Sequence, residues 1–155
     1  MTDQSLHNSS ENGLTILLVE DNPGDIRLIR EAFETANVGA ETTLHPISNG
    51  DDAVAFLTER TDDETRPFPD LALVDLNLPG RDGCAVLDAI RDDPRLRPLP
   101  VIILTSSADR DDIDRCYDAH ANAYVTKPTA PDEFESLAAS VGQFWFQQVQ
   151  LPPVQ

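Results

Sequence analysis

The sequence predicts an α/β fold in which a parallel β-sheet is covered by helices on both faces. Two observations lead to this prediction: short apolar runs rich in Val, Ile and Leu alternate with segments of helical periodicity. Short runs of this composition are typical of strands that are buried on both faces. Because the strand–helix alternation repeats five times, we expect right-handed crossovers between parallel strands.

Five strands are expected, at residues 15–20, 42–47, 71–75, 101–105 and 123–126. The second run, TTLHPI, is more polar than the other four. A strand with a polar face is better suited to an edge than to the centre of a sheet. We therefore expect residues 42–47 to form an edge strand.

Five helices are expected to alternate with these strands. Apolar residues recur at helical spacing within 25–36, 50–60, 82–91, 109–119 and from Pro131 onwards. Asn49 and Gly50 are suited to a turn and cap before the second helix, and Pro131 can open the last one because its missing N–H does no harm there. The apolar stripe predicted for the last helix comprises Phe134, Leu137, Ala138, Val141 and Trp145.

The length of 155 residues is typical of one domain. No apolar run approaches the roughly 20 residues of a membrane-spanning helix, and the polar start lacks the apolar centre of a signal peptide. We expect a cytoplasmic protein with a disordered segment at 1–13, one folded domain at 14–148 and a tail at 149–155. No output domain is expected after Phe146.

The composition is strongly acidic, with 28 acidic and 11 basic residues and a net charge of −17. This charge argues against binding to nucleic acid or to anionic membranes. Dense carboxylates are tolerated where salt screens their repulsion, so a halophilic protein from a high-salt cytoplasm is expected, with an ordinary acidic protein as the alternative. Cys84 and Cys116 form no CxxC motif and are expected to be reduced thiols.

Polar residues with distinctive chemistry stand at the ends of four expected strands. Glu20 and Asp21 stand at the end of the first, Asp75 ends the third, Thr105 ends the fourth and Lys127 follows the fifth. In parallel α/β sheets, ligands bind at the carboxyl ends of the strands. Three clustered carboxylates need a cation to neutralise them, and oxygen ligands suit Mg²⁺ or Mn²⁺.

These groups together are the parts needed for phosphoryl transfer to an aspartate: a carboxylate nucleophile, a divalent cation, an ammonium group and a hydroxyl group. Each residue alone has a simpler interpretation, as a turn residue, a cap or a solvated surface lysine. The joint arrangement favours a site, because Lys127 is the only lysine of the chain. Lysine is a compact point charge, whereas arginine is a wide planar fork.

Four sequence blocks resemble response-regulator receiver domains: ILLVEDNPGD, LALVDLNLPGRDG, VIILTSS and ANAYVTKP. The VEDNPGD opening and the late FW pair resemble the stand-alone subgroup of phytochrome-partner regulators. The resemblance covers about residues 14–146 and, with the acidic composition, suggests a haloarchaeal source. It implies a flavodoxin-like doubly wound (βα)5 sandwich with strand order 2-1-3-4-5, the order of flavodoxin and the chemotaxis receiver CheY.

The resemblance also implies a metal site and a phosphoacceptor. Asp75 corresponds to the phosphoacceptor, Asp21 to a direct ligand of Mg²⁺ or Mn²⁺, and Glu20 to a ligand acting through water. Asn77 corresponds to the residue whose backbone carbonyl completes the metal site. Departures from the usual pattern are Glu20, where many members have Asp, and His120, where glycine is usual and a left-handed turn is expected.

Further roles implied by the resemblance concern phosphate binding and switching. Lys127 corresponds to the phosphate-binding lysine, Thr105 to the switch hydroxyl and Tyr124 to the switch aromatic residue. Asn77 and Ser107 flank the route of the hydrolytic water and are expected to tune dephosphorylation. The peptide bond between Lys127 and Pro128 is expected to be cis.

The expected function is that of a single-domain response regulator, phosphorylated on Asp75 by a sensor histidine kinase and read by an unknown downstream protein. We expect no enzyme activity beyond self-catalysed phosphotransfer and dephosphorylation. Phe144 and Phe146 flank the apolar stripe of the last helix. They are either a homodimer surface or part of a wide core.

Three other interpretations are disfavoured. A haloacid-dehalogenase-type phosphatase needs an acid two residues after the nucleophile, where Asn77 cannot shuttle a proton. A nucleotide-binding Rossmann domain would carry GxGxxG after the first strand, and this motif is missing. A receiver that acts only as a scaffold predicts losses among the acids or the lysine, and all of them are present.

Overall fold

The computed structural model describes residues 13–36, 41–62, 68–105, 114, 121 and 123–150. Its sheet has five strands: β1 (Gly13–Val19), β2 (Glu41–Ile47), β3 (Leu71–Asp75), β4 (Val101–Thr105) and β5 (Ala123–Thr126). All neighbouring strands pair in parallel, in the order β2-β1-β3-β4-β5. The expected topology and the edge position of the polar strand are therefore confirmed.

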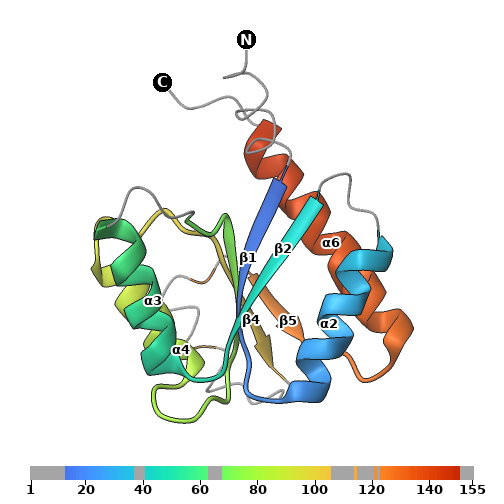
Figure 1. Ribbon diagram of the computed structural model, residues 1–155, viewed down its shortest axis with the longest axis horizontal. Helices are drawn as coiled ribbons and strands as arrows, with labels where there is room; N and C mark the ends of the chain where they lie inside the picture. The colour runs from blue at the N-terminus through green and yellow to red at the C-terminus, as the bar shows by residue number, and fades with distance from the viewer. Residues whose placement is uncertain are drawn as a thin grey trace.

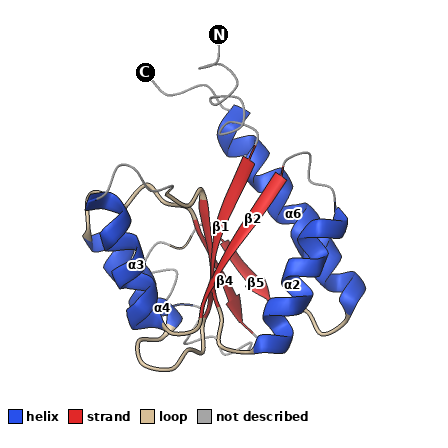
Figure 2. Ribbon diagram, in the orientation of Figure 1, coloured by secondary structure: helices blue, strands red, loops and turns tan. Residues whose placement is uncertain are grey.

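Within the described residues, four helices cover the sheet in two pairs (Figure 1): α2 (Pro23–Ala36), α3 (Gly50–Asp62), α4 (Gly83–Asp92) and α6 (Pro131–Gln150). Helices α2 and α6 lie on one face of the sheet, and α3 and α4 lie on the other (Figure 2). The helix expected at 109–119 falls almost wholly outside the described residues. Within them, no helix is long and apolar enough to cross a membrane.

The helix starts follow local capping chemistry. Asn22 Oδ1 accepts hydrogen bonds from the N–H groups of Gly24 and Asp25, and Pro23 occupies the first helical position, where its missing N–H costs nothing. Helix α2 therefore begins two residues earlier than expected. The predicted cap at Asn49 is confirmed, since its Oδ1 accepts from Asp52 N at 2.8 Å.

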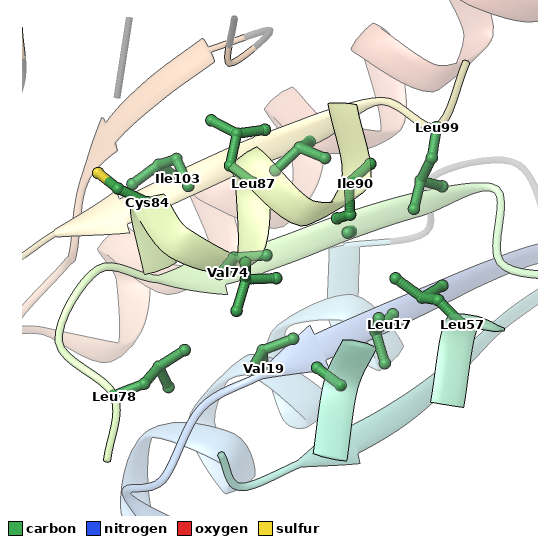
Figure 3. Packing of buried hydrophobic residues seen from close by; sticks show 14 of the residues in the cluster. Leu17, Val19, Leu57, Val74, Leu78, Cys84, Leu87, Ile90, Leu99 and Ile103 are labelled. Carbon is green, nitrogen blue, oxygen red and sulfur yellow. The ribbon is translucent and has the colours of Figure 1, made fainter. Parts of the chain in front are cut away.

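The core consists of two apolar layers, one on each face of the sheet. Strands β3 and β4 are buried along their whole length, as expected for central strands of a parallel sheet. Figure 3 shows part of the layer beneath α3 and α4, where Leu17, Val19 and Val74 of the sheet lie among helix residues that include Leu57 and Leu87.

The opposite layer confirms most of the stripe predicted for the last helix. Phe134, Leu137, Ala138 and Val141 of α6 are buried with Ile29 and Phe33 of α2. The side chains of Trp145, Phe144 and Phe146 lie outside the described residues, so the two interpretations of the aromatic pair stay as predictions.

One expectation about the cysteines is wrong. The sulfur of Cys84 is part of a disulfide, whereas reduced thiols were expected. Cys84 is buried at the start of α4, within the apolar layer of Figure 3. The spacing of two cysteines cannot show whether a fold brings them together. The other cysteine of the chain, Cys116, lies outside the described residues.

Candidate phosphoryl-transfer site

The predicted strand-end residues meet at the carboxyl edge of the sheet because backbone hydrogen bonds continue past the strands. Glu20 N donates to Ile47 O at 2.9 Å, and Lys127 N donates to Thr105 O at 2.7 Å. These bonds extend the parallel ladder by one residue beyond β1 and β5. The backbones of Glu20 and Lys127 are thereby fixed on either side of the end of β3, where Asp75 lies.

Three acids form a cluster at this edge. Glu20, Asp21 and Asp75 each place a carboxylate oxygen within 4.8 Å of the others. The Glu20 side chain is fully buried and that of Asp75 is 6% exposed, whereas Asp21 is exposed. Two of the three carboxylates are therefore buried, and the carboxylate of Asp21 is open to solvent.

The ammonium group of Lys127 lies against these acids. Its Nζ is 2.8 Å from Glu20 Oε1 and 3.1 Å from Asp75 Oδ2. A third carboxylate, Asp25 Oδ2 in the first turn of α2, lies 3.0 Å away. Only 11% of the Lys127 side chain is exposed, so this is a largely desolvated ion network rather than a surface contact.

Burial and pairing oppose each other in the electrostatics of the site. Burial, together with the nearby Asp75 charge, raises the pKa of Glu20 to about 7, although pairing with Lys127 lowers it. Partial burial tends to lower the pKa of Lys127, but the contacts with Glu20, Asp25 and Asp75 raise it above its ordinary value. The lysine therefore stays charged and serves as the counter-ion of the acids.

The residues present fit a hard divalent cation. Their donors are all oxygen atoms, as such cations prefer. Glu20 Oε1 is buried, and its close contact with Lys127 lacks the geometry of a hydrogen bond; no described group hydrogen-bonds to it. A buried carboxylate oxygen without a hydrogen bond is costly, and a cation held by Glu20, Asp21 and Asp75 would satisfy it.

The loop after β3 begins with a contact to the central acid. Asn77 N donates to Asp75 Oδ1 at 3.2 Å, which leaves Oδ2 to face Lys127. Helix α4 starts immediately behind this acid, since a Cβ at Gly83 would lie 2.5 Å from Asp75 O. The two oxygens of Asp75 are thus fixed by different parts of the fold.

The structure places the remaining predicted residues as far as it describes them. Thr105 is buried at the end of β4, where it is 2% exposed. Tyr124 lies in β5, and its backbone pairs with that of Ile103 in β4. The Tyr124 side chain, Ser107 and His120 lie outside the described residues, so their predicted roles stay untested.

The expected cis bond before Pro128 is wrong. The described residues contain no cis peptide bond. Lys127 reaches the acids with a trans bond, which is the lower-energy form before proline. Its position is fixed instead by the hydrogen bond from its own N–H to Thr105 O.

Reasoning from strand ends missed Asp25. This residue follows β1 by several positions and lies in a helix, so the strand-end rule does not reach it. The signal that could have found it is its place as the last residue of the VEDNPGD block.

Comparison with known proteins agrees with this geometry. The family model for the response regulator receiver domain matches residues 16–139 of this chain. The response regulator Rcp1 of Synechocystis sp. is 38% identical over 137 residues, which cover 88% of this chain and 92% of Rcp1.

Two solved structures have the same fold at similar identity. The phosphorylated cyanobacterial phytochrome response regulator RcpA matches with a TM-score of 0.77 and 38% identity, covering 90% of this chain and 99% of RcpA. The Mn²⁺-bound form of Rcp1 matches with a TM-score of 0.76 and 37% identity, at the same coverage of both chains. The chain therefore belongs to the response regulator receiver domain family, whose members are the partners of histidine kinases in phosphorelay signalling.

Proposed function

We propose that Asp75 accepts a phosphoryl group from a sensor histidine kinase beside Mg²⁺ or Mn²⁺. The observation that carries this proposal is the position of Lys127 Nζ, 3.1 Å from Asp75 Oδ2 and against the buried acids of the Glu20–Asp21–Asp75 cluster. The three acids would hold the cation, and the backbone carbonyl of Asn77 would complete its ligands. The Mn²⁺-bound form of Rcp1 supports a divalent cation in a relative.

The transfer is an in-line displacement. A carboxylate oxygen of Asp75 attacks the phosphorus of phosphohistidine; the new O–P bond forms as the P–N bond breaks, and the released imidazole nitrogen takes up a proton. Lys127 pairs with the phosphoryl oxygens as negative charge gathers on them. When bound, the cation supplies further neutralisation of these oxygens.

The acyl phosphate then shifts the domain between two states. Thr105, buried at the end of β4, turns its hydroxyl to donate to the phosphoryl group, and Tyr124 moves inward behind it. Asn77 and Ser107 set the lifetime through access of water to phosphorus. Turnover is confined to self-catalysed phosphotransfer and dephosphorylation, so the protein acts as a switch rather than as an enzyme.

The signal leaves through protein contact. A groove of about 510 Å³ runs between β5 and α6 beside Lys127, and its lining includes Val125, Pro128 and Leu137. A downstream protein reads this side of the domain. Phe144 and Phe146 contribute to a homodimer surface on α6. The similarity to RcpA supports a stand-alone regulator of the phytochrome-partner type.

The proposed setting is a salt-rich cytoplasm. The net charge of −17 supports a halophilic, haloarchaeal protein, because salt screens the mutual repulsion of its carboxylates. A histidine kinase that delivers phosphoryl groups acts on the cytoplasmic side of the membrane, and this supports the cytoplasmic location. Neither nucleic acid nor membrane is a proposed partner.

The test is intact-mass spectrometry after incubation with Mg²⁺ and acetyl phosphate, at low and at high salt. We expect one phosphoryl adduct that withstands acid, is lost in hydroxylamine and is absent from Asp75→Asn. Asp70→Asn is the matched control, because Asp70 immediately precedes the same strand and accepts a hydrogen bond from Thr15 N at 2.9 Å. It should be labelled like the wild type.

Stoichiometric labelling of Asp75→Asn would refute the assignment of the phosphoacceptor. A wild type that binds Mg²⁺ but gains no adduct at any salt concentration would instead indicate a scaffold that is not phosphorylated.

A further inference from the structure

Asp25 is a partner of Lys127 that lies outside the acid cluster. Its Oδ2 is 3.0 Å from Lys127 Nζ, across 102 positions of sequence. Its side chain is only 22% exposed, although acids in the first turn of a surface helix usually point into water. The contact joins the start of α2 to the end of β5.

Capping of α2 does not explain this orientation. Asn22 Oδ1 already accepts hydrogen bonds from Gly24 N and Asp25 N, and Asn22 O accepts from Ile26 N. The remaining local contribution of the Asp25 carboxylate is its favourable charge near the helix N-terminus, and that contribution does not require a contact with a lysine.

The three partners of the lysine differ in what they can do once a cation binds. An ammonium group has three N–H donors; here Asp25 and Asp75 accept hydrogen bonds from it, and Glu20 is its ion-pair partner at 2.8 Å. Glu20 and Asp75 belong to the group of described residues that can hold a metal ion, and Asp25 does not. The pairing with Asp25 is therefore the one that a cation leaves undisturbed.

We propose that Asp25 is a positioning residue for phosphoryl transfer, which holds the ammonium group of Lys127 beside Asp75. One N–H of Lys127 stays on Asp25 Oδ2, while the other N–H groups exchange Asp75 Oδ2 for the incoming phosphoryl oxygens. Asp25 acts only through the lysine. This inference rests on the proposed function of Asp75 as the phosphoacceptor.

The first test is the initial rate of adduct formation with acetyl phosphate at saturating Mg²⁺. Asp25→Ala should lower this rate roughly tenfold, the effect of losing one hydrogen bond to a charged group. Asp25→Asn should restore most of the rate, because its amide oxygen can still accept from the ammonium group. Asp132→Ala is the matched control: Asp132 is an exposed first-turn acid of α6, and its loss should leave the rate unchanged.

The second test uses the single lysine of the chain. Labelling with ¹⁵N-lysine gives one side-chain ammonium resonance, which is sharp only when hydrogen bonds slow its exchange with water. In the unphosphorylated protein with Mg²⁺, we expect a sharp resonance for the wild type and for Asp25→Asn. For Asp25→Ala we expect a resonance broadened or lost by exchange.

The outcomes separate this inference from the proposed function. An Asp25→Ala rate equal to the wild type, an Asp25→Asn rate no faster than Asp25→Ala, or a sharp ammonium resonance in Asp25→Ala with Mg²⁺ would each overturn the role of Asp25. A wild type that forms no adduct would overturn the proposed function instead, and the resonance would still report whether Asp25 holds the lysine.

Discussion

Lys127 places one positive charge among three carboxylates, so acidic groups outnumber basic groups at this site. Glu20 and Asp75 are buried, and Asp25 is largely covered. Burial of unpaired carboxylates is costly, which agrees with the raised pKa of Glu20. The side chains are thus arranged for a state with more positive charge than the lysine alone supplies.

Replacing Lys127 should therefore destabilise the protein in a metal-dependent way. Without divalent cations, Lys127→Met should lower the free energy of unfolding by about 3 kcal/mol, as expected when one partner of a buried ion pair is removed. Excess Mg²⁺ should recover much of the loss, because it neutralises the same carboxylates and binds only the folded state. Urea denaturation with and without Mg²⁺ measures both values.

Arg95→Met provides the control for this prediction. The pair between Arg95 and Asp93 is partly exposed, with side chains 49% and 24% accessible, and such pairs contribute about 0–1 kcal/mol. Its effect should be small and independent of Mg²⁺. A Lys127→Met loss that is equally large with and without Mg²⁺ would contradict a cation site at these acids.

At the scale of elements, the loop after Asp75 is held against the start of α3. A Cβ on Gly50 would lie 2.0 Å from Arg81 O, so the two backbones touch. Arg81 Nε also lies 3.1 Å from Asp51 Oδ1, and Gly80 adopts a positive φ of 73° beside Asp51. The start of α3 therefore supports the loop that carries Asn77.

Gly50→Ala should disturb this support and, through it, the site. The new methyl group cannot fit without moving the Arg81 backbone, and we expect a loss of about 2 kcal/mol in stability, typical of overpacking, together with slower labelling of Asp75. Thermal denaturation and the intact-mass assay measure the two effects. Asp51→Ala removes only the exposed ion pair and should cost less than about 1 kcal/mol. Equal losses for the two variants would show that the backbone contact is unimportant.

At the scale of the whole molecule, the parallel topology explains why the sequence predicted most of the site. Once five strands run in parallel, the residues that end them must share one edge, so Glu20, Asp75, Thr105 and Lys127 could be grouped without coordinates. Asp25 could not be grouped with them, because its contact depends on where a side chain of α2 points, 102 positions away from Lys127.

Two other expectations failed for similar reasons. The cis and trans forms before proline differ by only about 0.5–1 kcal/mol, and sequence cannot resolve so small a difference at Pro128. The disulfide of Cys84 depends on how closely the fold brings another sulfur to it rather than on spacing along the chain. In both cases tertiary packing decides what local chemistry leaves open.

The net charge of −17 is also a property of the whole molecule, because it acts against compactness through the sum of many weak repulsions. In about 0.1 M salt the screening length is roughly 10 Å, and in 1 M salt it is roughly 3 Å. Repulsion between neighbouring surface carboxylates should therefore nearly vanish at high salt. The chain has only 11 basic residues to offset this repulsion by forming ion pairs. One such pair joins Arg27 Nε to Glu31 Oε2 at 3.2 Å.

We accordingly expect KCl to stabilise the protein strongly. Raising KCl from 0.1 M to 2 M should increase the Tm by roughly 5 °C or more, equivalent to a few kcal/mol for a domain of this size. A chloride salt is used because sulfate also strengthens apolar burial and would raise the Tm by a second route. The gain should shrink near pH 5, closer to the isoelectric point of about 4.2, because fewer carboxylates are then charged. A Tm that stays constant in KCl at pH 7, or a gain of equal size at both pH values, would show that carboxylate repulsion does not limit stability.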